Sequence, residues 1–570
     1  MTQSRGAIKP LKRVSKENIM SKVGNENCDD KGSSIDLSRE DVREDLLEPS
    51  HGLTSAEIPT GVDRRNFLMR SAVVGAAAIM TGKTLMAAER TTEAVKSLPV
   101  MRPLSRGLYV HLASKGPITI TGDEFYKVGP GPSSSHTIGP MRITYDFYQR
   151  CSKLPADQLA KATALRVNLF GSLSATGKGH GTERATLAGL IGMEPATVDP
   201  LFLDGLRDKP DQSFKVKLGE KEIPVTLKDV VYDATKGDFH HQNTMVCHLL
   251  AGTEDIYQLE YYSVGGGFIE WKGYEPPKKN APKYPFETMK ELRAHADKNK
   301  LTIGQVMLAN EMSIAGKTEA EVNAFIDKII NAMLATVKSG LSMPEDGVLP
   351  GPIKLHSKAA TVYKRAMDDE NLADRGIGLL SACAIAASEE NARGHLVITA
   401  PTGGSAGVMP SLVYALMEGR KISREKVREG MLAALGVGYL CKHHATLAAA
   451  EGGCQAEIGV ASAMAAALVA TARGAESRIV ENAAESALEH HLGLTCDPVA
   501  GYVQVPCIER CAFGAVKAWT AYAIASNEIA NNHRVGLDET VQALAQTAKD
   551  MNSKYKETSE AGLALSVVLC

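Results

Sequence analysis

The most constraining stretch of this 570-residue sequence is an alanine-rich run at residues 457–470, which is apolar on nearly every side. A surface helix carries one apolar stripe, whereas a helix that is apolar all round must be enclosed by other helices or by lipid. The run is too short for a membrane span, and Arg473 follows it directly. It therefore predicts a central helix inside a helical bundle, with no membrane span.

Helical periodicity dominates from about residue 287 to the C-terminus, so the rest of the bundle is expected there. Before it, β-like runs at 165–170, 222–227 and 257–264 alternate with helical stretches, which indicates a small α/β or α+β region over 107–275. Four prolines among lysines at 273–285 are typical of a linker. The expected fold class is α+β and multidomain, with a small N-terminal α/β domain followed by an all-helical catalytic domain at 287–570.

The first hundred residues have a different composition. Residues 1–62 are polar with little hydrophobic periodicity, which predicts a disordered leader. In residues 63–106, Arg64 and Arg65 precede a short apolar run, and this resembles a twin-arginine export signal followed by a linker. A misassigned start codon or a non-functional amphipathic stretch stays open as the alternative, since the leader before the arginines is unusually long.

Charge and cysteine content narrow the functional classes. The formal net charge of −2 argues against a nucleic-acid partner bound by bulk electrostatics. Ten cysteines in a chain this long do not indicate a disulfide framework. Seven of them lie beyond position 380, which suits buried thiols, a metal site, or both.

The segment 129–141 (GPGPSSSHTIGPM) is the first candidate binding loop. Glycines and prolines fix a loop, and hydroxyls and an imidazole follow it. If a helix starts near Thr137, its backbone N–H groups would converge there on a carboxylate or phosphate. The simpler interpretation is that these residues only cap a helix, but a helix cap requires fewer polar side chains than this loop contains. The candidate substrate-binding residues are Ser133, Ser134, Ser135, His136 and Thr137.

The segment 171–182 (GSLSATGKGHGT) follows a strand-like run and reads as a glycine-rich turn into a helix. It does not match a nucleotide-binding P-loop. A histidine held between glycines is well placed to act as a general base, although a lone histidine is more often structural. His180 and Lys178 are the catalytic candidates.

A third set of motifs lies in the helical region. Residues 399–410 (TAPTGGSAGVMP) form another glycine-rich loop, with Thr402, Gly403 and Gly404 as candidate substrate contacts. Cys454, Cys496 and Cys507 lack the close spacing of a zinc site. Dispersed cysteines can ligate an iron–sulfur cluster, yet spacing alone favours buried, unreactive thiols over cluster ligands.

Together these segments closely resemble the iron–sulfur-dependent L-serine dehydratases (L-serine ammonia-lyases) of the single-chain bacterial type, from about Tyr126 to the C-terminus. The resemblance also rests on SVGGGFI at 263–269, EENARG at 389–394, GGCQAEIGVA at 452–461 and EHHLGLTCDPVAGYVQVPCIER at 489–510. It implies conversion of a small amino-acid substrate, L-serine, to pyruvate and ammonia in the cytoplasm by a homodimer. Export to the periplasm would follow if the twin-arginine segment is used.

The resemblance further implies a [4Fe–4S] cluster with one open iron and no pyridoxal phosphate. Its ligands would be Cys454, Cys496 and Cys507, with the terminal Cys570 capping the open iron until substrate displaces it. His180 would be the base, and the serine loop and Gly403–Gly404 would hold the carboxylate and amine.

Three departures affect substrate preference, and one of them is the divergent segment 442–445 (KHHA) before the first cluster cysteine. Gly403 and His491 stand where the family usually has asparagine. A related lyase acting on cysteine or threonine, or a non-catalytic cluster-bearing sensor, therefore remains as an alternative.

Overall fold

The computed structural model describes residues 116–235 and 237–567, which belong to one unit of the chain. The predicted leader (1–62), the twin-arginine-like segment and linker (63–106) and Cys570 lie outside the described residues. The roles predicted for these segments therefore stay predictions.

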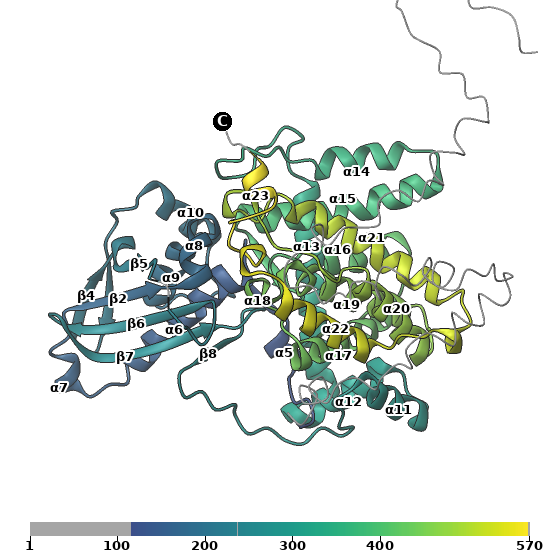
Figure 1. Cartoon of the computed structure of the whole chain (residues 1–570), viewed down its shortest axis with the longest axis horizontal. Coiled ribbons are helices and arrows are strands. Elements are labelled where there is room, and N and C mark those ends of the chain that lie inside the picture. Colours follow the sequence, from purple (N-terminus) through teal and green to yellow (C-terminus); the bar gives the residue numbers. More distant parts are fainter. Residues whose placement is uncertain (1–115, 236, 568–570) are drawn as a thin grey trace, which may run out of the picture. The chain divides into compact units, whose positions relative to one another are not determined.

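The first half of the described chain is built on a five-stranded mixed sheet in the order β5-β2-β6-β7-β8 (Figure 1). Only the β2–β5 pair is parallel, so the region is α+β rather than α/β. The strands predicted at 165–170, 222–227 and 257–264 are present as β2, β4 and β7. The strand bounds are β2 Ala164–Leu169, β3 Phe214–Leu218, β4 Lys221–Val225, β5 Val230–Tyr232, β6 Thr244–Ala251, β7 Glu254–Ser263 and β8 Ile269–Trp271.

Short helices pack on this sheet because β2 and β6 alternate buried and more exposed residues, leaving one apolar face to cover. Phe147 of α6 and Leu187 of α9 join Val167 and Met245 of the sheet in one fully buried core. The helices are α5 Gly122–Phe125, η1 Ser134–Ile138, α6 Gly139–Cys151, α7 Ala156–Leu159, α8 Gly171–His180, α9 Thr182–Leu190, α10 Pro200–Asp208 and η2 Leu227–Asp229.

From residue 289 onward the chain is helical, and α19 lies at its centre. Every residue of α19 (Ile458–Ala472) is buried, as the alanine-rich run predicts. Three consecutive helices, α11, α12 and α13, are each preceded by a threonine whose side chain accepts a hydrogen bond from the backbone N–H three residues on. The Glu or Gln at that third position accepts in turn from the threonine N–H, which forms a capping box.

The remaining helices surround or extend this core. Their bounds are α11 Met289–Asn299, α12 Ile303–Ala315, α13 Glu319–Leu341, α14 Ala359–Asp368, α15 Leu372–Arg393, α16 Val408–Tyr414, η3 Ala415–Gly419, α17 Arg424–His444, α18 Ala449–Gly452, η4 Gly453–Gln455, α20 Ser477–Glu489, η5 Val499–Gly501, α21 Cys507–Ala525, η6 Ala530–Asn532, α22 Leu537–Asp550, η7 Ser553–Tyr555 and α23 Leu563–Ser566.

The expectation of an all-helical second domain is wrong at one place. Strand β9 (Leu396–Thr399) follows α15 and pairs antiparallel with β1 (Lys127–Pro130), which belongs to the first half of the chain. Val397, Ile398 and Thr399 of β9 are buried. A short run with three buried β-branched residues satisfies its backbone by pairing with another strand, and four residues are too few for a periodicity to be recognised in the sequence. This pair brings the loops after β1 and β9 side by side.

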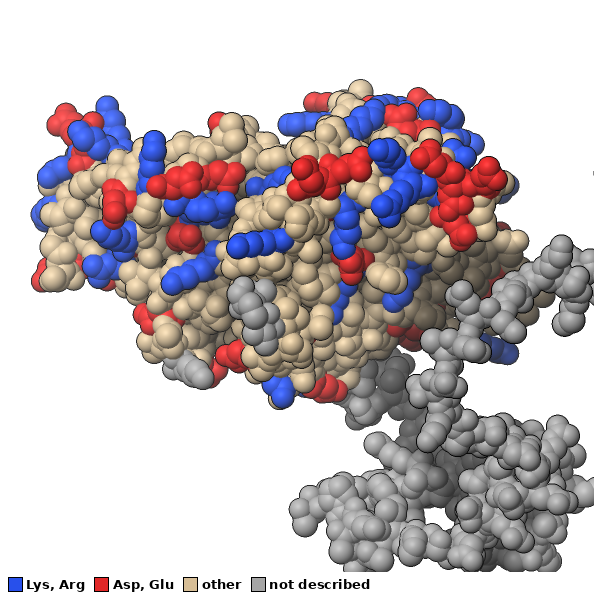
Figure 2. All heavy atoms as spheres, turned by 90° about the horizontal axis from the view of Figure 1, so that it is seen from above, with Lys and Arg blue, Asp and Glu red and all other residues tan. Residues whose placement is uncertain are grey.

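Among the described residues, no single helix is long and apolar enough to cross a membrane. Ala449–Gln455 and Ile458–Ala472 reach the required length only together, and they meet at a bend of 54°. On the face seen in Figure 2, lysines and arginines lie close to aspartates and glutamates.

Candidate active site

The serine loop (residues 131–138) follows β1 and runs into η1. All five polar residues predicted to bind substrate are buried there. The Ser133 hydroxyl accepts the His136 N–H at 3.1 Å, and so caps the helix start. The Ser135 hydroxyl lies 2.9 Å from His136 Nδ1. Ser134 Oγ has no partner, which leaves it free for a ligand.

Thr137 has a structural use that the sequence did not indicate. Its hydroxyl donates to the His180 carbonyl at 2.9 Å and accepts the Ser133 N–H at 3.2 Å. One buried hydroxyl therefore ties the serine loop to the segment that carries the candidate base.

The structure places His180 at the last residue of α8, not on a turn. Residues 171–180 form this helix despite three glycines, and α8 ends where Gly181 adopts φ 63°. His180 Nδ1 lies 2.9 Å from the Thr176 carbonyl. A carbonyl can only accept, so Nδ1 carries the proton and Nε2 presents its lone pair. Burial lowers the pKa of His180 to about 4, which keeps the imidazole neutral.

Glu557 is a third member of this site, and the sequence reading missed it. Its Oε1 lies 3.5 Å from His136 Nδ1 and 3.8 Å from His180 Nε2, and its side chain is buried. Burial, Glu457 and Cys454 together raise the pKa of Glu557. The His136 and His180 rings lie 4.6 Å apart between centroids.

The second glycine-rich loop meets the serine loop directly. A Cβ on Gly403 would lie 2.8 Å from the Ser134 backbone nitrogen and 3.0 Å from the Pro132 carbonyl. A Cβ on Gly404 would lie 2.6 Å from Glu457 Oε2. Only glycine permits such close backbone approach. Thr402 is fully buried, and its hydroxyl lies 3.0 Å from Ser405 Oγ.

Two of the three candidate thiols, those of Cys454 and Cys496, come together from separate segments of the chain. Cys454 in η4, Glu457 just after it, and Cys496 each offer one ligand atom, and these atoms lie within 4.8 Å of one another. Cys507 begins α21 and is also buried, but its thiol is not within that distance of all three. The eight described cysteines are all unpaired and buried.

The pKa of Cys454 is shifted in the opposite direction from those of its neighbours Cys507 and Glu457. A hydrogen bond from Cys496 and the nearby Arg510 guanidinium lower the pKa of Cys454 to about 7. The pKa of Cys507 is raised by burial and by the Cys454 thiolate. Burial and the Cys454 thiolate likewise raise the pKa of Glu457 to about 8. Arg510 is held by the Thr495 carbonyl at 2.7 Å, so a fixed positive charge faces the thiols.

These residues suit a soft metal centre. Buried thiolates are the donors that iron–sulfur clusters take, and a neighbouring guanidinium offsets their charge. Cys454 and Cys496 with Glu457 can hold a metal ion, and Cys507 is the adjoining thiol.

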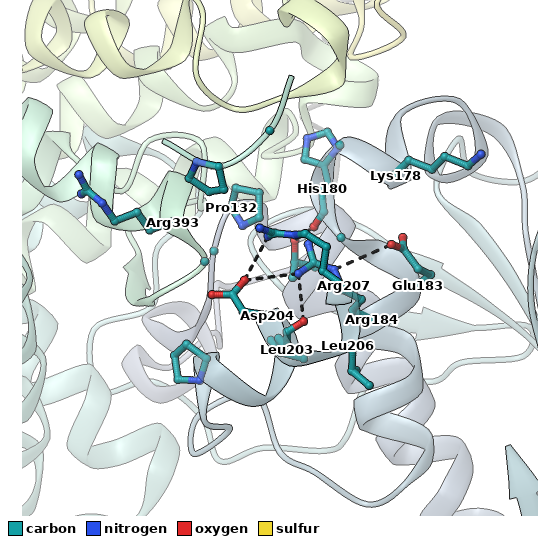
Figure 3. Close-up of a pocket in the computed structure, with 18 of the residues that line it drawn as sticks. Pro132, Lys178, His180, Glu183, Arg184, Leu203, Asp204, Leu206, Arg207 and Arg393 are labelled. Carbon is teal, nitrogen blue, oxygen red and sulfur yellow. Dashed lines mark hydrogen bonds and ion pairs between the residues drawn. The ribbon is translucent and has the colours of Figure 1, made fainter. Parts of the chain in front are cut away.

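Lys178 lies at the outer edge of this site, on the exposed face of α8. Its side chain is exposed, its ammonium lies 5.7 Å from the Tyr232 ring centroid, and Figure 3 shows it pointing away from His180. It lines a pocket of about 250 Å³ that also reaches His180. The charged residues lining that pocket are Lys178, Arg184, Arg207 and Arg393 against Glu183 and Asp204. The excess of positive charge favours anionic ligands.

Comparison with known proteins agrees with this geometry. Residues 123–274 match the family model of the serine dehydratase beta chain, and residues 298–564 match that of the serine dehydratase alpha chain. The chain belongs to the serine dehydratase family. Residues of both family models contribute to the site, with His136 and His180 from the first and Cys454, Cys496 and Cys507 from the second.

The similarity to individual relatives in the family extends over almost the whole length of each relative. The L-serine dehydratase of Haemophilus influenzae is 38% identical over 455 residues, which span 78% of this chain and 98% of the relative. That of Streptomyces coelicolor is 38% identical over 456 residues, covering 78% and 99%. L-serine dehydratase 1 of Escherichia coli is 37% identical over 453 residues, covering 78% and 98%.

Three residues of the site were not among the sequence candidates. Glu457 and Arg510 stand inside the motifs at 452–461 and 489–510, three positions after Cys454 and Cys507, so their closeness to the cysteines in sequence could have marked them. Glu557 had none, because it lies in a polar stretch near the C-terminus whose place in the fold depends on backbone pairing with the Cys496 segment.

Proposed function

We propose that this chain is an L-serine ammonia-lyase, which converts L-serine to pyruvate and ammonia. The observation that supports the proposal is the buried, unpartnered His180 Nε2. It lies 3.8 Å from Glu557, whose N–H donates to the carbonyl of Cys496, one of the candidate ligands. The names of the relatives support serine as the substrate.

The cofactor proposed here is a [4Fe–4S] cluster with one open iron, held by Cys454, Cys496 and Cys507. The support is the donor set, with three buried thiols, one of low pKa, beside Arg510. When bound, the cluster would supply a Lewis acid for the departing β-hydroxyl group. Cys570 is proposed as its removable cap.

The chain's own residues would perform the proton transfer and the orientation. His180 Nε2 takes the Cα proton, because its tautomer is fixed by Thr176 and it is neutral at physiological pH. Ser134 Oγ and the loop at Gly403–Gly404 hold the carboxylate. The aminoacrylate that results tautomerises to an imine, which hydrolyses without further help. Lys178 receives no catalytic role, since it lies on the exposed side of the α8 helix.

The test compares His180→Ala with wild type and with His248→Ala, a partly buried histidine of strand β6 that pairs with Asp255. Loss of a general base lowers kcat by about 10²- to 10⁴-fold. His180→Ala should lose this much serine turnover and keep the visible absorbance of the cluster, while His248→Ala keeps both. Turnover near wild type in His180→Ala contradicts the assignment. Pyruvate, 2-oxobutyrate and sulfide release from serine, threonine and cysteine separate the competing lyases, and a non-catalytic sensor releases none.

A homodimer is the proposed assembly. An apolar groove of about 870 Å³ lies between α14, α15 and α21, and Leu372 and Ile377 on its wall are 81% and 54% exposed. Exposed apolar patches of this kind are typical of interaction surfaces. Leu372→Glu combined with Ile377→Glu should give a monomer in light scattering, and an unchanged mass contradicts the use of this groove.

A further inference from the structure

The site contains hydrogen-bond acceptors that face one another with no donor between them. Glu557 Oε1 lies 3.8 Å from His180 Nε2, which is longer than a hydrogen bond. His180 Nε2 and Glu557 Oε2 are both buried and both lack a partner. Burial of acceptors without donors is unfavourable, so the geometry calls for a ligand group that carries N–H or O–H donors.

The backbone holds Glu557 in this position at a cost. Its φ is 58°, in the left-handed region that favours glycine. Its N–H donates to the Cys496 carbonyl at 2.8 Å, and its carbonyl accepts from Ser172 Oγ at 2.9 Å. The carboxylate is thereby fixed between a candidate cluster ligand and the helix that carries the candidate base.

The surroundings favour a cation as the donor. The ion-pair contacts of the Glu557 carboxyl within the described residues are to two histidines, His136 Nδ1 at 3.5 Å and His180 Nε2 at 3.8 Å. Both neighbouring histidines are neutral, because burial lowers the pKa of His136 and of His180. A ligand bearing one positive charge and several N–H donors would satisfy the orphaned oxygen and offset the charge.

We propose that Glu557 binds the α-ammonium group of the substrate. This inference rests on the proposed function, because L-serine carries a −NH₃⁺ group one bond from the carbon that loses its proton. An ammonium at Glu557 brings the Cα–H towards His180 Nε2, while the carboxylate points to Ser134 Oγ. Glu557 is therefore the residue that selects amino acids over acids that lack an amino group.

The experiment compares two ligands that differ only in that group, L-serine and 3-hydroxypropionate, on the holoenzyme. KM for serine and the inhibition constant of 3-hydroxypropionate are measured for wild type, Glu557→Gln and Glu560→Gln. Glu560 is exposed, lies three residues further along the same segment and serves as the matched control. Iron content and visible absorbance are recorded for each protein.

Glu557→Gln should raise KM for serine by about 10- to 100-fold and change the 3-hydroxypropionate constant by less than about threefold, as expected when one partner of a buried charge pair is removed. Glu560→Gln should match wild type in both. Equal weakening of the two ligands, or no change in either, overturns the proposal. If Glu557→Gln loses iron, Glu557→Asp replaces it in the test. Asp keeps the negative charge but places it one methylene group further from the ligand, so KM for serine must still rise while the 3-hydroxypropionate constant stays unchanged.

Failure of the proposed function is a separate result. A cluster-loaded wild-type protein that releases no pyruvate from serine refutes the function itself. Turnover by wild type with unselective Glu557 variants refutes only the inference about Glu557.

Discussion

The hydroxyl of Thr137 offers a sharp test of how the candidate base is held. Thr137→Val keeps the side-chain shape but removes the hydrogen bond to the His180 carbonyl (2.9 Å) and the one from the Ser133 N–H (3.2 Å). Thr137 is buried, so water cannot replace the hydroxyl. Each buried group left unsatisfied costs about 1–3 kcal/mol, which gives a destabilisation of about 2–6 kcal/mol.

Thr163→Val is the matched control. The Thr163 hydroxyl also makes two backbone hydrogen bonds, to the Leu250 carbonyl at 3.1 Å and from the Gly252 N–H at 2.8 Å, but it is exposed. We expect it to cost less than about 1 kcal/mol. Denaturant unfolding and kcat/KM for serine are measured for both variants. Equal stability and equal kcat/KM in the two variants would refute the reasoning, since burial would then make no difference.

Three further outcomes follow from the site. Gly403→Ala should abolish most serine turnover while Gly376→Ala, in open space on α15, does not, because the new Cβ at 403 would lie 2.8 Å from the Ser134 nitrogen; steady-state kinetics check this. Cys496→Ser should lower the iron and sulfide content of anaerobically purified protein, and full cluster loading would contradict the ligand set. Burial holds the pKa of His180 near 4, below the ordinary 6.5, so the stability that depends on its neutral form is present above pH 6.5 and is lost as pH falls to about 4, by about 3 kcal/mol. The difference in unfolding free energy between wild type and His180→Ala should shrink over that range, and a constant difference would contradict it.

Much of the fold could be predicted from local pattern. The run at 457–470 is apolar all round and does become the buried core helix α19. The run at 165–170 alternates buried and more exposed residues as strand β2, and the run at 257–264 becomes strand β7, which is buried only towards its end. Strand β9 could not be predicted this way, because four residues give no measurable period and the strand exists only through its partner β1.

The residues of the site also fall into two groups, those that local sequence motifs mark and those whose position depends on contacts distant in the sequence. Ser134, His180 and the cysteines stand in motifs whose composition is unusual, so the sequence marks them. Glu557 is brought to His180 by the parallel bridge between Cys496 and Lys556, a contact between residues sixty positions apart that no local pattern encodes. Lys178 shows the opposite case, in which the motif is clear but the position of the side chain depends on the helix. It shares a motif with His180, but two positions along a helix turn its side chain to another face.

We infer that this chain dehydrates L-serine at a buried thiol-bound cluster, and that hydrolysis of the resulting imine takes up one water and gives pyruvate and ammonia. The most direct measurement is the anaerobic assay of purified full-length protein, with iron and sulfide determined on the same sample and pyruvate and ammonia followed together. Serine should yield pyruvate and ammonia in equal amounts, and both rates should rise in proportion to cluster content. Cluster-loaded protein that forms neither product from serine would contradict it.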